Sequence, residues 1–282
     1  MSNSVEITSL NKSYGKFPVL QDVNLNVPAG SIYGLIGPNG AGKTTLIKAL
    51  VGALNYNSGK ISVLGLDPLK DKWELRRSIG YMPQTPSLYG DLTALQNVIF
   101  FGKAHNIPDV EKEAERILEF TELSDRKKDL VRNFSGGMQK RVSLACTLIH
   151  KPKIIFLDEP TAAVDPQLKK RTWALFKQLS HDGVTIFVST HLMDEAMLCD
   201  KVTILRQGKV LMVDTPQNII SKGRTKITVS RNGAKTELIS GSSAASIAME
   251  LKKFGLDKEI ESLNFNQDNI EDIILDIINK QQ

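Results

Sequence analysis

A glycine-rich segment between an expected strand and an expected helix could bind phosphate groups. It reads G-x-x-x-x-G-K-T and consists of Gly37, Pro38, Asn39, Gly40, Ala41, Gly42, Lys43 and Thr44, with Thr45 following it. Glycines let the backbone turn several N–H groups toward phosphate oxygens, the lysine adds a charge at the β- and γ-phosphates, and the threonine hydroxyl can bind Mg²⁺. The positive end of the following helix points at the same anion. The segment therefore predicts a nucleoside triphosphate site.

Two carboxylates at the end of an apolar strand could supply the second half of such a site. Asp158 and Glu159 directly follow the apolar residues 154–157. Asp158 is suited to hold Mg²⁺ through water, and Glu159 to polarise the water that attacks a γ-phosphate. The alternative is an acidic pair that merely ends a strand, but the preceding phosphate loop favours the functional interpretation.

A second pair of glycines lies between these two motifs, in the run Phe134-Ser135-Gly136-Gly137-Met138-Gln139. The glycines free the backbone to approach an anion. Helical periodicity from Met138 onward places the positive end of a helix at the same point. An anion site without a lysine of its own makes sense if it completes a site located elsewhere.

In this order, the three motifs resemble the ATP-binding cassette of ABC transporters. A phosphate loop alone also occurs in kinases and small GTPases, whereas the Ser-Gly-Gly run resembles the signature loop of this family, usually LSGGQ. The resemblance implies an α/β fold, a phosphate-loop NTPase of the ABC type, with ATP and Mg²⁺ as ligands. It also implies that Ser135, Gly136 and Gly137 cap the γ-phosphate bound by the opposite subunit.

Four single residues match further positions of the family's pattern. Tyr14 corresponds to the aromatic residue that stacks on adenine, and Gln84 to the glutamine that touches the Mg²⁺ site and faces the membrane partner. Asp165 corresponds to the loop that crosses the dimer interface, and His191 to the histidine at the γ-phosphate. By this resemblance the catalytic residues are Glu159, His191 and Lys43, and the metal-binding residues are Thr44, Gln84 and Asp158.

The signature run departs from the usual pattern at two positions. Phe134 and Met138 stand where Leu and Gln are common, but Ser135 and both glycines are kept, so capping of ATP is expected to persist. The Ser-Gly-Gly-Met form, the segment 85–93 and the tail 269–275 are similar to the exporter branch that serves drug, lipid and polysaccharide permeases. The transported substrate does not follow from this similarity.

The elements that must position these residues form an α/β core with a helical insertion. Apolar strands are predicted at 32–36, 154–157 and 184–188, with a helix at 167–179 between the last two, which indicates a buried parallel sheet. The first sixty residues otherwise suggest short strands broken by turns, and 202–205 with 210–213 suggest a hairpin. Between about 88 and 150 the apolar period is helical, so a separate helical lobe carries the signature run.

We expect an ABC ATPase domain at 1–220 and a small accessory α+β domain at 221–282. In the second domain, strands at 226–230 and 236–240 flank a turn at Arg231-Asn232-Gly233. A final helix shows one apolar stripe, made of Ile270, Ile273, Ile274, Ile277 and Ile278. Such a stripe is expected to be buried on the chain's own cassette or on the opposite copy.

Composition limits the class of protein. The 282 residues are 41% hydrophobic and 24% charged with a net charge of +5, as in ordinary globular chains. This mild positive charge fits phosphate binding and proximity to anionic lipid, and it gives no reason to expect nucleic acid. Cys146 and Cys199 show no disulfide or zinc spacing, which fits a reducing cytosol.

The relation to a membrane is expected to be indirect. The first ten residues lack a signal-peptide pattern, and no apolar run approaches the roughly 18–20 residues that cross a bilayer. We therefore expect a peripheral protein on the cytoplasmic face of the cell membrane, bound to a separate transmembrane permease subunit. The second cassette of the pair is either another copy of this chain or a sister cassette.

Two other classes of cassette ATPase fit the chain less well. Cassette ATPases that act on ribosomes usually carry two cassettes in one chain, and this chain has one. Those of DNA repair or chromosome maintenance need a long coiled-coil or zinc-bearing insertion between the motifs, and the segment from Lys43 to Asp158 is too short for it. Transport is thus the predicted class of function.

Overall fold

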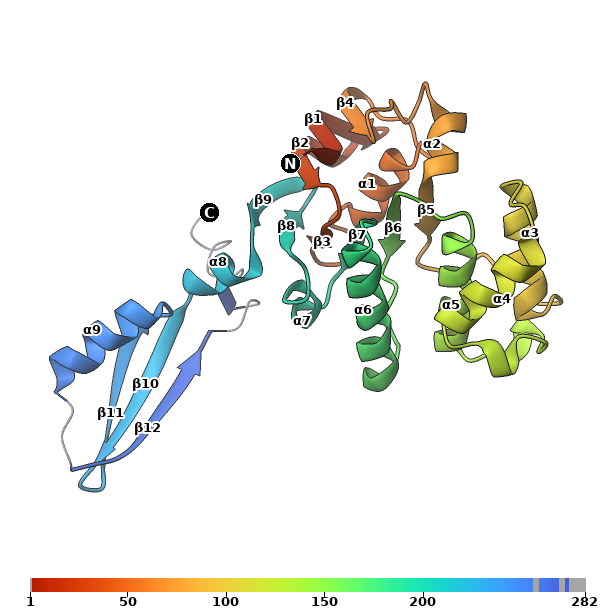
Figure 1. Ribbon diagram of the computed structural model, residues 1–282. Helices are drawn as coiled ribbons and strands as arrows, with labels where there is room; N and C mark the ends of the chain where they lie inside the picture. The colour runs from red at the N-terminus through yellow and green to blue at the C-terminus, as the bar shows by residue number, and fades with distance from the viewer. Residues whose placement is uncertain (1, 256–258, 269–271, 274–282) are drawn as a thin grey trace. The chain divides into compact units, whose positions relative to one another are not determined.

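The computed structural model describes residues 2–255, 259–268 and 272–273, and its chain divides into two units (Figure 1). The first unit comprises Met1–Leu192 and Leu198–Val213, and the second comprises Met193–Met197 and Asp214–Gln282. The motifs predicted to bind nucleotide all belong to the first unit. The predicted division at residue 220 stays a prediction.

A six-stranded sheet of order β5-β6-β7-β3-β8-β9 carries the site. Its strands are β5 (Ile79–Met82), β6 (Ile154–Asp158), β7 (Thr185–Thr190), β3 (Ile32–Ile36), β8 (Lys201–Arg206) and β9 (Lys209–Asp214). The first five are parallel, and every residue of β3, β6 and β7 is buried, which confirms the predicted parallel core. Parallel strands bring their carboxyl ends to one edge, so the segments after β3, β6 and β7 meet there.

A second sheet, three-stranded and antiparallel with the order β2-β1-β4, covers the side of the core opposite the six-stranded sheet. It is formed by β1 (Asn3–Tyr14), β2 (Phe17–Pro28) and β4 (Ser58–Val63). The expectation of short strands was wrong here, because β1 and β2 are each 12 residues long. Ser9 and Asp22 have positive φ angles, and the β1–β2 register shifts between Ile7 and Leu10, so bulges interrupt the apolar alternation without ending either strand.

Helix α1 (Lys43–Leu50) lies in the core shared by these two sheets. Its buried residues Leu46, Ile47 and Leu50 belong to one hydrophobic cluster with side chains of β1, β2, β3 and β6. Helix α2 (Lys72–Ser78) adds the buried Leu75 to this cluster. Packing therefore fixes the helix that follows the phosphate loop.

The predicted helical lobe contains α3 (Ala94–Ala104), α4 (Val110–Phe120) and α5 (Gly136–Leu148), with 3₁₀ turns at Ser124–Arg126 and Val131–Asn133. Thr93 and Gln96 form a capping box that begins α3. Helix α6 (Pro166–His181) contacts β7 and β3, and a short helix α7 (Met193–Ala196) follows β7. In the described part of the chain, no helix combines the length and the apolar character that spanning a membrane requires.

The second unit contains a small antiparallel sheet of order β11-β10-β12. Its elements are α8 (Pro216–Ser221), β10 (Arg224–Arg231), β11 (Ala234–Gly241), α9 (Ala244–Phe254) and β12 (Ile260–Gln267). The predicted strand pair is confirmed, since Asn232 and Gly233 both have positive φ angles in the turn between β10 and β11. Strand β12 and helix α9 were not predicted. Of the predicted stripe, only Ile273 is described, and it is buried; Ile270, Ile274, Ile277 and Ile278 lie outside the described residues.

The hairpin predicted near residues 202–213 is also present, with β8 and β9 as neighbours. Gln207 and Gly208 have φ angles of 48° and 77°, as a type I′ turn requires. The fold is thus an α/β cassette with a small C-terminal antiparallel sheet, as predicted.

Candidate nucleotide site

The phosphate loop is built by backbone packing that requires glycine. It joins β3 to α1 and runs through Gly37, Pro38, Asn39, Gly40, Ala41 and Gly42. A Cβ atom on Gly37 would lie 2.2 Å from the carbonyl oxygen of Leu205, and one on Gly42 would lie 2.8 Å from that of Val19. Gly42 also has a φ of +106° at the N-cap of α1. A side chain at either position would therefore displace the loop.

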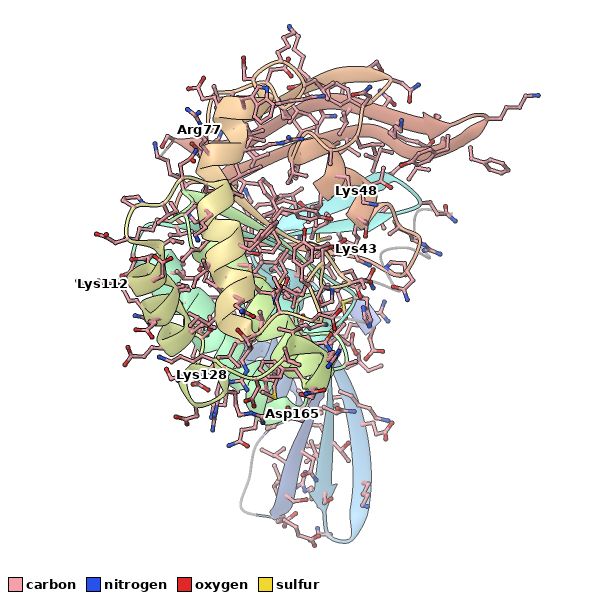
Figure 2. The ribbon with its side chains drawn as sticks, turned by 90° about the vertical axis from the view of Figure 1, so that its right-hand side faces the viewer. Lys43, Lys48, Arg77, Lys112, Lys128 and Asp165 are labelled. Carbon is pink, nitrogen blue, oxygen red and sulfur yellow. The ribbon has the colours of Figure 1, made fainter. Side chains whose placement is uncertain are left out.

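Lys43, labelled in Figure 2, is the first residue of α1, and its side chain is buried. Its Nζ donates to the carbonyl oxygens of Gly37 at 2.8 Å and Pro38 at 3.2 Å. It also lies 3.3 Å from Oε1 of Glu159. A buried cation with a single carboxylate beside it is suited to receive the phosphates of a nucleotide. Thr44 and Thr45 follow in the first turn of α1 and are partly buried.

Asp158 ends β6 and is fully buried. The hydroxyl of Ser189 on β7 donates to its Oδ1 at 2.5 Å, because the parallel register sets these two residues side by side. Its Oδ2 is buried with no hydrogen-bond partner among the described residues. A carboxylate oxygen of this kind needs a proton or a cation, so Asp158 fits a metal-binding role.

The Glu159 carboxylate brings together three other predicted residues. Besides Lys43, Nε2 of Gln84 donates to its Oε2 at 3.1 Å, and Nδ1 of His191 lies 3.2 Å from the same oxygen. Glu159 itself is buried and has a φ of +49°, which is uncommon for a residue with a side chain. The ends of β3, β6 and β7 and the segment after β5 thus supply one charged cluster.

The signature residues and Asp165 lie at helix starts. Ser135 is the N-cap of α5, and its Oγ accepts from the backbone N–H of Met138 at 3.3 Å. Among the described residues outside its own helix and chain neighbours, none comes within 4 Å of a Cβ atom placed on Gly136, whereas one on Gly137 would lie 2.7 Å from Cδ2 of Leu168. Asp165 caps α6 by accepting from the backbone N–H of Leu168 at 2.9 Å.

None of the contacts in the described part of the chain joins Ser135, Gly136 or Gly137 to the phosphate loop. Their predicted role in a second subunit's site therefore stays a prediction.

Tyr14 stands at the end of β1, directly across the strand pair from Phe17. Its ring is 49% exposed, and Nζ of Lys12 lies 4.8 Å from the ring centre. The same β1–β2 hairpin reaches the phosphate loop through Val19, whose carbonyl is packed against Gly42. The ring is thus accessible to a planar ligand, in keeping with the predicted contact to the base.

Ser189 is a residue of the site that the sequence argument missed. It holds Asp158, and it also accepts from the backbone N–H of Glu159 at 3.1 Å. The available signal was its place at the end of a buried strand, two residues before His191, where a parallel neighbour of β6 would present a hydroxyl to the carboxylates.

Comparison with known proteins places the chain in a family. Residues 20–162 match the family model described as "ABC transporter". The linearmycin resistance ATP-binding protein of Bacillus subtilis (strain 168) is 35% identical over 81% of this chain and 75% of its own length. The Nod factor export ATP-binding protein I of Rhizobium meliloti (strain 1021) is 36% identical over 78% of this chain and 66% of its own length.

Two solved structures are similar to this chain. One is cbiO1 from Clostridium perfringens, part of the ABC transporter complex cbiONQ, with 29% identity over 78% of this chain and 91% of that one and a TM-score of 0.70. The other is the dimeric post-hydrolysis state of the cassette MJ0796 bound to ADP and Pi, with 28% identity over 75% of this chain and 98% of that one and a TM-score of 0.70. The family match, the two relatives and the charged cluster agree: the chain belongs to the ABC transporter family, as an ATP-binding and ATP-hydrolysing subunit.

Proposed function

We propose that two cassettes close over two ATP molecules and that Glu159 activates the water in each. The supporting observation is the convergence of Lys43, Gln84 and His191 on the Glu159 carboxylate. Each phosphate loop faces Ser135, Gly136 and Gly137 of the opposite cassette. The open space beside Gly136 supports this role, because no described residue outside its own helix and chain neighbours comes within 4 Å of a Cβ atom placed there.

Mg²⁺ would be held by Asp158, Thr44 and Gln84. The unpartnered Oδ2 of Asp158 fits this ion, which binds proteins through one or two carboxylates together with substrate phosphates. When bound, the ion neutralises charge on the phosphates and stabilises the transition state. The remaining chemistry belongs to the side chains around it.

Each polar group of the cluster has one task in hydrolysis. Glu159 accepts a proton from the attacking water and orients it toward the γ-phosphate. Lys43 turns from the Glu159 carboxylate toward the β- and γ-phosphates, and His191 donates to the γ-phosphate as its charge spreads. Tyr14 stacks on the adenine, and Asp165 crosses the interface. Loss of the γ-phosphate then weakens the contact between cassettes and opens the pair.

The pair of cassettes lies on the cytoplasmic face of the membrane and drives a separate transmembrane permease. Gln84 lies at the contact with this permease. The direction is export, since relatives include a Nod factor export ATP-binding protein and a linearmycin resistance ATP-binding protein. The second cassette is another copy of the chain or a sister cassette. Residues 1–220 form the ATPase domain and 221–282 an accessory domain.

The decisive experiment measures steady-state ATP hydrolysis by the purified chain beside Glu159→Gln, together with molecular size in ATP. We expect hydrolysis by the wild type to rise more steeply than protein concentration. We expect Glu159→Gln to lose turnover and to form a dimer locked by ATP. Turnover retained in Glu159→Gln would contradict the proposed base, whereas a wild type without turnover or dimer would exclude a self-sufficient homodimer and require a sister cassette.

A further inference from the structure

Lys140 joins the signature helix to the loop that carries the catalytic carboxylate. It lies in the second turn of α5, and its Nζ donates to the carbonyl oxygen of Glu159 at 3.1 Å and to that of Ala162 at 2.5 Å. Both carbonyls belong to the turn that follows β6. One ammonium group therefore fastens this turn to the helix that begins at Ser135.

The residue that Lys140 holds has a conformation that needs support. Glu159 has a φ of +49°, where a Cβ atom is crowded by the backbone. Its N–H donates to the backbone oxygen of Ser189 and to the Ser189 hydroxyl, each at 3.1 Å. Its carbonyl accepts from the Ala162 N–H at 3.3 Å and from Lys140. Strand β7 thus holds the N–H of Glu159, and Lys140, which belongs to the helical lobe, holds its carbonyl oxygen.

Charge explains why a lysine is effective here. Two carbonyl oxygens that face the same point repel each other, and an ammonium group placed between them turns this repulsion into two charge-assisted hydrogen bonds. Gly137 and Lys140 of α5, Pro160 of the turn and Leu168 of α6 line one pocket, so the turn lies beside both helices. The two hydrogen bonds of Lys140 limit the conformations that this turn can adopt.

We propose that Lys140 is a positioning residue for ATP hydrolysis, acting through the backbone of Glu159. This inference rests on the proposed role of Glu159 as the base. By holding the turn 159–162, Lys140 aims the carboxylate at the point where Lys43, Gln84 and His191 meet. These two hydrogen bonds of Lys140 end on the turn and not on the phosphate loop, so we expect the rate of hydrolysis to depend on it and the binding of ATP to be unaffected.

Three variants test this proposal. Lys140→Met keeps most of the length of the side chain and removes both hydrogen bonds, and Lys140→Arg restores a cation with donors. Lys112→Met changes an exposed lysine on α4, also in the helical lobe, and is the matched control (Figure 2). The measurements are kcat and KM for ATP, the Kd of a fluorescent ATP analogue, and the midpoint of thermal unfolding.

We expect Lys140→Met to lower kcat at least ten-fold while the Kd of the analogue changes less than two-fold. Lys140→Arg should recover at least a third of the wild-type kcat, and Lys112→Met should equal the wild type. An unchanged kcat in Lys140→Met overturns the proposal. So does a parallel loss of ATP affinity, or an Lys140→Arg variant that is as slow as Lys140→Met at equal thermal stability. If Lys140→Met does not fold, Lys140→Gln replaces it under the same criteria.

Glu159→Gln measured in parallel separates this inference from the proposed function. Loss of turnover in Glu159→Gln with full turnover in Lys140→Met would overturn the role of Lys140 alone. Full turnover in Glu159→Gln would overturn the assignment of the base, and the positioning role with it.

Discussion

At the scale of the residue, one hydroxyl contacts both acidic residues at the end of β6, the carboxylate of Asp158 and the backbone of Glu159. Ser189 Oγ donates to Oδ1 of Asp158 and accepts from the backbone N–H of Glu159, leaving Oδ2 of Asp158 for a cation. Ser189→Ala removes both hydrogen bonds. Because groups that orient a metal ligand typically contribute 10- to 100-fold to metal affinity or activity, we expect a rise of about ten-fold or more in the Mg²⁺ concentration that gives half-maximal hydrolysis. Titration of ATPase activity with Mg²⁺ measures this.

A control for Ser189→Ala is available on a nearby strand. Thr203 on β8 is also a buried hydroxyl, and it shares a 2.7 Å hydrogen bond with the hydroxyl of Tyr33. Thr203→Val should lower the free energy of unfolding by about 1 kcal/mol and leave the Mg²⁺ requirement unchanged. An equal Mg²⁺ requirement in Ser189→Ala and wild type would show that Ser189 does not orient the metal ligand.

Most of the candidate site could be predicted from residue types and short spacings in the sequence. Lys43, Asp158 and Glu159 were predictable because phosphate and Mg²⁺ chemistry demands a lysine after a glycine-rich loop and carboxylates at the end of a strand. Ser189 was not predictable with the same means, because its contact with Asp158 depends on the register between two strands distant in sequence. Lys140 gives no local signal either, since a lysine in a helix is usually solvated and only the fold brings it to the turn after β6.

At the scale of the element, the two glycines that begin α5 are expected to serve different purposes, one in binding and one in packing. Gly136 is the first residue of α5, and an added methyl group would meet no atom of the described residues within 4 Å beyond its own helix and chain neighbours. Gly136→Ala should therefore leave the free energy of unfolding unchanged or raise it by up to about 1 kcal/mol. If this space receives the opposite cassette's nucleotide, the same variant in a Glu159→Gln background should lose the ATP-locked dimer, as measured by size in ATP.

Gly137→Ala is the contrasting variant. Its methyl group would lie 2.7 Å from Cδ2 of Leu168, so α6 or this side chain has to shift. Because Cδ2 is the far end of a flexible, partly buried side chain, we expect a loss of no more than about 1 kcal/mol in the free energy of unfolding. In the Glu159→Gln background, a Gly136→Ala chain that still forms the ATP-locked dimer would contradict the proposed contact between Gly136 and the opposite cassette's nucleotide.

A stacked histidine pair makes the stability of the helical lobe depend on pH. His105 caps the end of α3 and stacks on His150 with ring centres 3.8 Å apart, and Nε2 of His150 lies 2.8 Å from the carbonyl oxygen of Ile79. Burial lowers the pKa of His150 from 6.5 to about 4, and it lowers the pKa of His105 as well. Both rings are therefore neutral in the folded protein at neutral pH.

The sign of the effect follows from these pKa values. The unfolded chain binds the proton first as pH falls, so the contribution of His150 is complete above pH 6.5 and is lost between 6.5 and about 4. We expect about 2 kcal/mol less stability at pH 5 than at pH 7.5 from this residue, measured by urea denaturation. His150→Gln should reduce this dependence, and the exposed His181→Gln should retain it. Equal pH slopes in all three chains would refute the assignment.

Periodicity identified the elements whose pattern is long and regular. The helical lobe was found in this way, whereas the buried strands β3, β6 and β7 were found as short, continuous apolar runs. Strand β5 was not predicted, because Ile79–Met82 is too short to show a period and is defined by its pairing with β6. Strand β12 was missed for a different reason: its side chains are mostly exposed, so it shows little apolar alternation and its pairing with β10 defines it.

At the scale of the whole molecule, chain order and spatial grouping differ. Met193–Met197 lies between β7 and β8 in sequence, yet it belongs to the same unit as Asp214–Gln282. Composition changes along the chain suggested a boundary near 220, but no composition signal marks a four-residue helix that groups with residues beyond 213. Contacts between distant segments decide such a grouping, and they become visible only in the folded chain.

This grouping predicts that truncation at residue 220 lowers the stability of the chain but leaves its ATP binding in place. In a chain ending at residue 220, Met193–Met197 would lose most of its unit, although Glu195 and Ala196 are buried in the full chain. We expect ATP binding to persist, because the phosphate loop belongs to the other unit. The free energy of unfolding should fall by about 2 kcal/mol, which lowers the midpoint of thermal unfolding by roughly 4–8 °C in a chain of this size. Calorimetry of both chains measures the midpoint of thermal unfolding, and titration with a fluorescent ATP analogue measures ATP binding. An unchanged midpoint in the shortened chain, with two separate transitions in the full chain, would mean that the units unfold independently and that α7 draws its stability from the cassette alone.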